Sequence, residues 1–462
     1  MKHAKQVLFL FVAFLAFAGP AEAADIQVEG YALTNGKYVL KKENVVRGSF
    51  VDKRDGKSYR TVRIGPQTWM AENLDYDYKV NGASYGSMCY NDSAEYCARY
   101  GRLYTWAATM DSATTGCGMG RTCAPVGETR GVCPEGWHVP RFWEWRIIGT
   151  ITGEFPGTAL KSAAGWSEGE EGSDDYGFSV LPGGGRNDDG RFADVGALGY
   201  YFSASEKGAE GAEGIRFHGQ TTDVYFVIGE KRLALSVRCV KNAEKTETGS
   251  FTDSRDGKSY KWTKIGSQTW MAENLNYDYK VNGSTYGNWC YNALPANCGR
   301  YGRLYTWAAA MDSATTGCGS GGTCAVGGRV RGVCPAGWHL PDSAEWGALG
   351  AAVGNRLVGG AMLKSMVGWT GVRQLKPGTR DEYVVADGNG LDNYGFSALP
   401  AGMFNAGIGQ FSGVRMVCGW ISTDQTQEGF VRAWWMSNEN LSLLEDNAFH
   451  KESAASVRCV KD

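Results

Sequence analysis

The feature that most constrains this chain is an internal duplication. The stretch GSFVDKRDGKSYRTVRIGPQTWMAENLDYDYKVNG, from Gly48, returns from Gly249 as GSFTDSRDGKSYKWTKIGSQTWMAENLNYDYKVNG, and both copies close on SVRCVK. The period of about 200 residues is far longer than a solenoid unit, which has roughly 20 to 50 residues. A segment of this length can bury a core of its own. The duplication therefore predicts two domains of one fold, at residues 48–241 and 249–462.

The beginning of the chain has the features of a secretory signal peptide. Lys2 and Lys5 precede the apolar stretch Val7–Ala18, and Ala21-Glu22-Ala23 offers a cleavage site. The apolar stretch has 12 residues, whereas a membrane-spanning helix needs about 20. We therefore expect residues 1–23 to be removed, and the mature protein to be exported, either secreted or held at the cell surface, without spanning a membrane.

Two further segments lie outside the copies. Residues 24–47 form a leader in which Asn35-Gly36 predicts a hairpin turn. Residues 242–248, NAEKTET, are short, polar and charged, as expected of a linker between domains.

The chain has 13 cysteines, and in an exported protein these favour disulfides over metal thiolates. Twelve of them fall into two sets of six with closely similar spacing. The spacing favours Cys89–Cys97, Cys117–Cys123 and Cys133–Cys239 in the first copy, and Cys290–Cys298, Cys318–Cys324 and Cys334–Cys459 in the second. Six cysteines allow many pairings, so this connectivity is one of several. The leftover Cys418 aligns with Gly199 and is expected to be a buried free thiol, with an intermolecular disulfide as the alternative.

Local patterns predict an α+β fold. Leu304, Trp307, Ala308 and Met311 have helical spacing within GRLYTWAAAMDSA. The segment LPDSAEWGALGAAV predicts a second helix, with Asp342 at its N-cap and the glutamate three residues later completing a capping box. Tyrosine-, valine- and threonine-rich runs around Asp-Gly and Ile-Gly turns predict strands. Each domain should be a twisted, mainly antiparallel sheet with two helices, long loops and disulfides.

One cluster of polar residues raises the question of chemistry. Cys334–Trp346 reads CPAGWHLPDSAEW and brings together a histidine and two carboxylates. The first copy, CPEGWHVPRFWEW, keeps the histidine and the glutamate but has Arg141 in place of Asp342. An acid required for catalysis would not become arginine in a working duplicate, and no second histidine is shared by the copies. We therefore interpret His138 and His339 as structural residues bonded to the backbone, and expect neither a catalytic nor a metal site.

The segments DGKSYKWTKIGSQTWMAENLNY, GRLYTWAAAM, CPAGWHLPDSAEW, GFSALPAG and SVRCVK have counterparts in both copies. Together they resemble the Fibrobacter succinogenes major paralogous domain, which implies an exported bacterial protein with no established activity. More distantly, HLPDSAEW and the terminal VRCV are similar to the formylglycine-generating enzyme and C-type lectin-like superfamily. That resemblance implies a C-type-lectin-like fold for each domain. The oxidase activity of that superfamily uses a pair of cysteines, of which this chain has only Cys418, so the departure argues against an enzyme.

Two acidic stretches raise the question of a calcium site. The acidic, glycine-rich stretches Gly183–Phe192 and Asp387–Gly395 carry the oxygen ligands that calcium prefers. They lie on opposite sides of the shared YGFSxLP segment and do not align. Asp174 and Asp392 do share a position, but a single carboxylate is not a site. We expect solvated turns and no cofactor, with a calcium site as the alternative.

The copies differ most in their loops, and a rigid frame with divergent loops is typical of binding scaffolds. Aromatic residues in or beside these loops are Tyr200 and Tyr201 in the first copy and Trp420, Trp434 and Trp435 in the second. Such rings can stack on sugars or anchor a protein partner. The Trp434-Trp435 pair is the leading candidate, because adjacent strand residues face opposite sides of a sheet and both are not easily buried.

These observations predict a non-enzymatic, exported binding protein whose leading ligand is polysaccharide. The alternative is a structural or adhesive component of the cell envelope that binds proteins. A third and less favoured function is an oxidase that would use copper and a reactive thiol at Cys418. The formal net charge of −2 gives no basis for binding nucleic acid.

Overall fold

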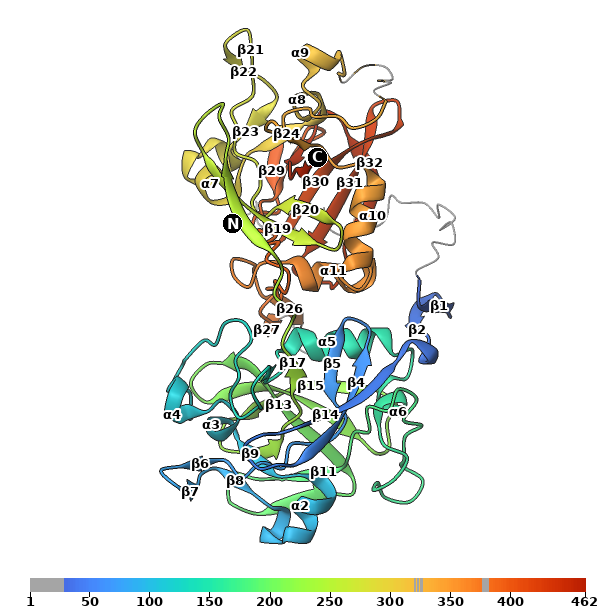
Figure 1. Cartoon of the computed structure of the whole chain (residues 1–462), viewed down its shortest axis with the longest axis vertical. Helices are drawn as coiled ribbons and strands as arrows, with labels where there is room; N and C mark the ends of the chain where they lie inside the picture. The colour runs from blue at the N-terminus through green and yellow to red at the C-terminus, as the bar shows by residue number, and fades with distance from the viewer. Residues whose placement is uncertain (1–28, 320, 322–323, 325–326, 376–381) are drawn as a thin grey trace.

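The computed structural model describes residues 29–319, 321, 324, 327–375 and 382–462. The predicted signal peptide, residues 1–23, lies outside the described residues, as does the start of the leader. Figure 1 shows two sheet-rich domains stacked along the long axis of the molecule, the first coloured blue to green and the second yellow to red. Within the described ranges, every helix is too short or too polar to cross a bilayer.

Each domain begins and ends in one antiparallel sheet. In the first domain its order is β10 (Trp137–His138), β17 (Val240–Lys241), β5 (Gln67–Met70), β4 (Ser58–Ile64) and β3 (Val46–Val51). In the second domain the same order from the other side is β18 (Thr248–Thr252), β19 (Ser259–Ile265), β20 (Gln268–Met271), β34 (Val460–Lys461) and β25 (Trp338–His339). The last strand of each domain therefore lies beside strands from its beginning.

A larger sheet forms the rest of each domain, and most of its pairs are antiparallel. The first domain uses β8 (Ser87–Met88), β9 (Leu103–Thr105), β11 (Gly183–Arg186), β12 (Phe192–Val195), β13 (Leu198–Lys207), β14 (Gly211–His218), β15 (Val224–Glu230) and β16 (Ala234–Ser236). The second uses β23 (Asn288–Trp289), β24 (Leu304–Thr306), β28 (Met403–Asn405), β29 (Gln410–Ser412), β30 (Val417–Gln427), β31 (Phe430–Ser437), β32 (Leu444–His450) and β33 (Ala454–Ser456). Small hairpins project from the sheets: β6 (Lys79–Val80) with β7 (Ala83–Ser84), β21 (Lys280–Val281) with β22 (Ser284–Thr285), and β26 (Val372–Leu375) with β27 (Glu382–Ala386).

The helices are more numerous and shorter than the two per domain that the sequence predicts. They are α2 (Ala94–Tyr100), α3 (Trp106–Thr109), α4 (Ser112–Thr115), α5 (Phe142–Ile151), α6 (Pro156–Leu160), α7 (Pro295–Tyr301), α8 (Trp307–Ala310), α9 (Ser313–Thr316), α10 (Ser343–Ala352) and α11 (Arg356–Leu363). The helix expected from Leu304 begins only at Trp307, because Leu304 pairs with Ser456 in the larger sheet. The capping box of α10 is confirmed: Asp342 accepts from the Glu345 backbone N–H at 2.9 Å, and Glu345 accepts from the Asp342 backbone N–H at 3.1 Å.

The core of each domain is built on closely packed aromatic rings under its longest helix. In the second domain Trp346 of α10 lies 4.7 Å from Trp270, 5.4 Å from Trp420 and 6.0 Å from Trp434, measured between ring centroids. Trp145 of α5 takes the same place in the first domain, 4.6 Å from Trp69. These helices therefore cover one face of the larger sheet.

The six disulfides have the connectivity that the spacing favoured. They are Cys89–Cys97, Cys117–Cys123, Cys133–Cys239, Cys290–Cys298, Cys318–Cys324 and Cys334–Cys459. The two longest join the segment before α5 or α10 to the last strand of the same domain. Each of them thus closes a ring that contains more than half of its domain.

Residues that differ between the copies form the contact between the domains. Arg141, at the start of α5, donates from Nη1 to the Gly390 carbonyl at 2.9 Å and pairs with Asp387 at 3.2 Å. The Trp143 side chain is 1% exposed, and its Nε1–H donates to Asp387 at 3.1 Å. Its counterpart Ala344 is exposed. Arg141 is therefore more than a lost helix cap, because it binds the second domain.

The leader and the linker both pack against the domains. The leader hairpin is present, with β1 (Tyr31–Thr34) and β2 (Lys37–Leu40) joined at Asn35-Gly36. It belongs structurally to the first domain, since the Tyr176 hydroxyl donates to the Leu40 carbonyl at 3.0 Å. In the linker, Thr246 donates to the Tyr394 carbonyl at 3.2 Å. Residues 242–248 are therefore docked rather than extended through solvent.

Candidate functional site

Three of the five aromatic residues predicted to bind ligand are core residues. Tyr201, Trp420 and Trp434 are at most 1% exposed. The Tyr201 hydroxyl donates to Asn73 at 2.9 Å, and Trp420 Nε1–H donates to Asn274 at 2.9 Å. The prediction that they form an exposed stacking surface is wrong, because β13, β30 and β31 are covered on that face by α5 or α10.

The other two, Tyr200 and Trp435, lie on the opposite face and are half-buried. Trp435 packs across Gly419, where a Cβ atom would come within 2.4 Å of the ring, and its centroid lies 5.6 Å from Phe449. Trp434 and Trp435 do face opposite sides, as strand geometry requires. Because both faces of the sheet are packed, only part of the Trp435 ring is accessible, and ligand binding by these two residues stays a prediction.

Another group of rings lies elsewhere in the second domain, and we call Trp289, Phe404 and Phe411 the aromatic platform; Trp289 is exposed, and the two phenylalanines are half-buried. Trp289 of β23 is 37% exposed and lies 5.2 Å from Phe404 of β28. Phe404 in turn lies 5.1 Å from Phe411 of β29. The β28–β29 hairpin therefore brings two rings beside a tryptophan more than a hundred residues earlier in the chain. The sequence signal was available, since the first copy has Met88 and Arg186 where the second has Trp289 and Phe404.

A second candidate site is a polar cavity of about 350 Å³ in the first domain, which we call the Tyr76 pocket. Its twelve lining residues come from four segments: residue 54, residues 76 and 78–81, residues 111 and 113–114, and residues 130–132. These segments are the turn after β3, the β6–β7 hairpin with the residues before it, the start of α4 and the approach to Cys133. The pocket is thus built from loops held by the smaller sheet and the long disulfide.

The walls of the Tyr76 pocket are fixed by close polar contacts. The Arg54 guanidinium lies 3.9 Å from the Tyr76 ring centroid, binds Asp52 at 2.6 Å and donates to the Val132 carbonyl at 2.7 Å. Burial alone would raise the pKa of Asp52, but the hydrogen bonds and charge of Arg54 outweigh burial and lower it. The carboxylate therefore stays ionised beside its arginine. The Tyr78 hydroxyl donates to Asp111 at 2.6 Å and holds that second carboxylate at the pocket wall.

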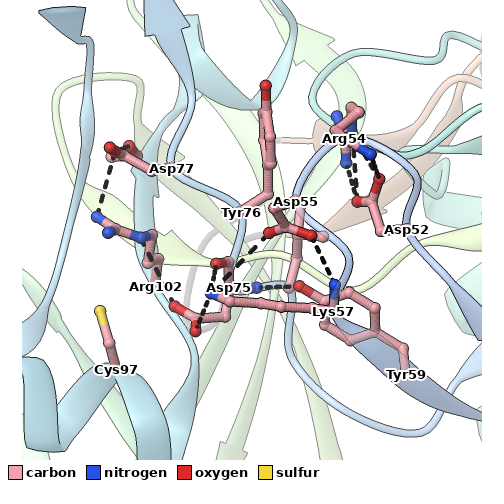
Figure 2. A network of polar contacts seen from close by, with 12 residues as sticks. Asp52, Arg54, Asp55, Lys57, Tyr59, Asp75, Tyr76, Asp77, Cys97 and Arg102 are labelled. Atoms are coloured by element: carbon pink, nitrogen blue, oxygen red, sulfur yellow. Dashed lines mark hydrogen bonds and ion pairs between the residues drawn. The ribbon is translucent and has the colours of Figure 1, made fainter.

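A charged network supports the pocket from behind. Figure 2 shows Tyr76 between the Asp52–Arg54 pair and a second group centred on Asp75 and Arg102. Lys57 binds Asp75 at 2.5 Å, and Arg102 lies 3.6 Å from Asp75 and 3.3 Å from Asp77. Acidic and basic side chains alternate in this group. The group therefore ties the start of β4 to the segment before the β6–β7 hairpin, and its net charge is small.

The second domain repeats the lining residues of the Tyr76 pocket. All twelve lining positions have the same amino acid 201 positions later. Arg255 lies 3.9 Å from the Tyr277 ring centroid, and the Tyr279 hydroxyl donates to Asp312 at 2.8 Å. A search for differences between the copies cannot find such a site, because its residues are the same in both. Identical residues alone do not indicate a site either, since the shared fold also requires them.

The shared histidines are structural, but their partners are side chains and not the backbone groups we expected. His138 Nε2 lies 2.8 Å from Glu144 and Nδ1 lies 3.0 Å from Asn242. His339 lies 2.8 Å from Glu345 and 2.7 Å from Asp462. Burial alone would lower the pKa of His138, but the charge and hydrogen bond of Glu144 raise it to about 8. Each histidine thus ties its helix to the end of its domain.

The His138–Glu144 pair makes the stability of the protein depend on pH in a defined way. The pKa of His138 is about 8 in the folded protein and 6.5 in the unfolded chain, a difference that corresponds to about 2 kcal/mol. Because the folded pKa is the higher one, this stabilisation is complete below pH 6.5 and is lost as the pH rises through 8. Urea denaturation between pH 6 and 9 should show the wild type losing about 2 kcal/mol more than His138→Gln. Parallel curves for the two proteins would contradict this assignment.

The stretch Gly183–Phe192 runs through β11, a turn at residues 188–190 and the start of β12, and Asp387–Gly395 is a loop that ends in a turn. Asp174 accepts from the Ser179 backbone N–H at 2.7 Å, and Asp392 does the same for Ser397 at 2.7 Å. Asp387 is held in the contact between the domains. In the described part of the chain no three His, Cys, Asp or Glu side chains are grouped so as to hold a metal ion.

Cys418 is buried in β30 and takes part in no disulfide. Its place in the core of the second domain raises the pKa of the thiol far above its usual value through burial. A thiolate is the reactive form of cysteine. The environment therefore favours the unreactive thiol.

The fold and its sites define a class: sheet-rich domains in tandem, each fastened by three disulfides, with loop-built surface sites. Within that class the chain belongs to the Fibrobacter succinogenes major domain family, whose model matches residues 62–241 and 263–461. The family named from the sequence motifs is thereby confirmed, in two tandem copies. No curated protein and no solved structure matches the chain.

Proposed function

We propose that this chain is an exported, non-enzymatic protein that binds polysaccharide, and that each domain has a C-type-lectin-like fold. The N-terminal sequence and the six disulfides support export, since disulfides persist in oxidising surroundings. The pairing of β5 with β17 and of β20 with β34, which joins the two ends of each domain, supports the fold. The buried thiol of Cys418 supports a function other than oxidase.

The aromatic platform carries the proposal. Trp289 presents 37% of its surface to solvent although it is in contact with Phe404. Exposed rings held by a framework of strands are suited to stack on the apolar face of a sugar, because they lose little conformational entropy on binding. In the first domain, Tyr90 lies 5.1 Å from both Tyr96 and Phe192. Because Met88 stands where Trp289 does in the second domain, we expect the second domain to bind neutral glycans more strongly.

Replacing Trp289 with alanine should weaken binding to a neutral polysaccharide such as β-glucan or xylan by about 10- to 30-fold. An aromatic anchor of this kind contributes about 2 kcal/mol. Affinity electrophoresis of the mature protein, with quenching of tryptophan fluorescence as a second readout, measures the loss.

Phe226→Ala is the matched control, because Phe226 is 38% exposed but lies in the first domain, outside the platform. This variant should bind as the wild type does. A folded wild-type protein that binds no polysaccharide, or equal losses for Trp289→Ala and Phe226→Ala, would contradict the proposal. In the first case the adhesive function, with a protein partner, takes its place.

A further inference from the structure

We propose that the Tyr76 pocket and its copy in the second domain are two equivalent sites for a sugar that carries a carboxylate, such as a uronic acid, and that the chain cross-links acidic polysaccharide through them. The inference rests on the proposed function in that the ligand is a polysaccharide. It uses other residues, however, and assigns another class of sugar than the aromatic platform does.

The charges of the pocket favour an anion. Arg54 is neutralised by Asp52, which binds its Nε and Nη2 atoms. Arg130 is exposed, and its hydrogen bond within the described residues runs from Nε to the Cys133 carbonyl at 3.1 Å. This bond orients the guanidinium and leaves its two terminal nitrogens to bind a ligand. They form a planar pair of donors that matches a carboxylate. Lys79 at the rim is 53% exposed and lies 3.8 Å from Asp77, which balances its charge, so Arg130 is the group that would bind the anion.

The acceptors of the pocket favour a sugar over an acidic peptide. Asp111 lines the pocket and accepts the Tyr78 hydroxyl with Oδ1, so its second carboxylate oxygen is a further acceptor that a ligand can use. Sugar hydroxyls can donate to that oxygen, and the side chains of Asn81 and Thr114 line the same cavity. An acidic peptide such as poly-glutamate has no side-chain hydroxyl to donate to Asp111. A uronic acid supplies both a carboxylate for Arg130 and hydroxyl donors for Asp111.

The second domain presents the same groups. Arg331 donates from Nε to the Cys334 carbonyl at 3.1 Å, as Arg130 does to Cys133. Asp312 accepts the Tyr279 hydroxyl at 2.8 Å. Because the lining is identical, the two sites should have equal affinity for a short ligand.

The placement of the sites makes the chain a cross-linker. Figure 1 shows the β6–β7 hairpin near one end of the long axis and the β21–β22 hairpin at the other. Arg141 and Trp143 hold the domains against each other, so the sites do not swing toward one another. A short oligosaccharide can therefore occupy only one site, whereas one protein can join two polymer strands.

The test is isothermal titration calorimetry of the mature protein with a trigalacturonate, compared with a neutral trisaccharide. The wild type should bind two trigalacturonates with one affinity, and Arg130→Gln and Arg331→Gln should each bind one. The double variant should bind about tenfold more weakly or not at all, since it lacks both guanidinium groups. Both arginines are exposed, so circular dichroism should show that the variants fold.

Polygalacturonate provides the second readout. Mixing it with the wild type should give turbidity that is greatest at an intermediate ratio of protein to polymer, as cross-linking requires. The single variants should bind the polymer without turbidity. Turbidity that persists in either single variant would overturn the cross-linking, and a wild-type stoichiometry of one would overturn the equivalence of the sites.

Three further outcomes separate this inference from the proposed function. If the double variant no longer binds trigalacturonate but still binds β-glucan, the pockets act independently of the aromatic platform and the inference stands. If the wild type binds β-glucan but no trigalacturonate, the inference fails and the proposed function remains. If poly-glutamate displaces trigalacturonate as well as polygalacturonate does, the pockets recognise carboxylates without sugars and the assignment of a sugar ligand is overturned.

Discussion

Trp143→Ala is expected to lower the free energy of unfolding by about 3–5 kcal/mol, the usual loss when a large buried ring is removed, and to loosen the contact between the domains. Trp143 is 1% exposed, its Nε1–H donates to Asp387, and the Lys364 ammonium lies 4.7 Å from its ring centroid. The substitution leaves a cavity and deprives Asp387 of a donor. Differential scanning calorimetry should show two separate transitions where the wild type has one, and small-angle scattering should show a larger radius of gyration.

Ala344 provides the control, because it is the exposed counterpart of Trp143 in the second copy. Ala344→Ser should leave the transition and the radius unchanged. Arg141→Met removes the bonds to Gly390 and Asp387 without opening a large cavity, so it should shift both readouts in the same direction by less. A Trp143→Ala protein with one transition and an unchanged radius would show that the domains are held together elsewhere.

The second large effect concerns the long disulfides. Replacing Cys133 and Cys239 together with serine should lower the free energy of unfolding by about 4–5 kcal/mol, because this bond joins residues 106 positions apart and restricts the unfolded chain strongly. Both sulfurs are buried, and serine also places hydroxyls in the core. Urea denaturation, followed by circular dichroism, measures the loss.

The short Cys89–Cys97 bond is the matched comparison. It joins residues 8 positions apart, for which the same chain-entropy argument gives about 2–3 kcal/mol. Removal of this pair should therefore cost less than removal of the long one. Equal losses would mean that strain or solvation, and not loop closure, sets the contribution of these disulfides.

Much of the fold follows from local patterns and from the duplication. The Asn35-Gly36 turn, the capping box of Asp342 and the short cysteine pairs depend on residues close in sequence, and the long cysteine pairs recur in both copies with separations of 106 and 125 residues. The helix expected from Leu304 failed at its first residues, since pairing with Ser456 outweighs the helical period there. Such long-range pairing leaves no local signal.

The candidate sites were harder to predict than the fold. Strand alternation correctly placed Trp434 and Trp435 on opposite faces, but it carries no information on which face is covered, and helix α10 covers that of Trp434. Arg141 looked like a lost cap because its partner Asp387 lies in the other domain. The platform needed the β28–β29 hairpin to bring Phe404 beside Trp289. In each case the missing information was a contact between distant segments.

The position of the first and last strands in one sheet also decides how each domain would respond to a pulling force. The last strand of the first domain, β17, lies beside β5, and its first strand, β3, lies two places further along, so tension on the two ends of the domain acts on one sheet. The Cys133–Cys239 bond carries that load across the domain. Residues 134–238 lie inside its ring and are shielded from the force, and so is the larger part of the second domain behind Cys334–Cys459. Under tension each domain can therefore lengthen only by its N-terminal part, which contributes Trp69 or Trp270 to the aromatic core, while the segment inside the ring cannot be extended.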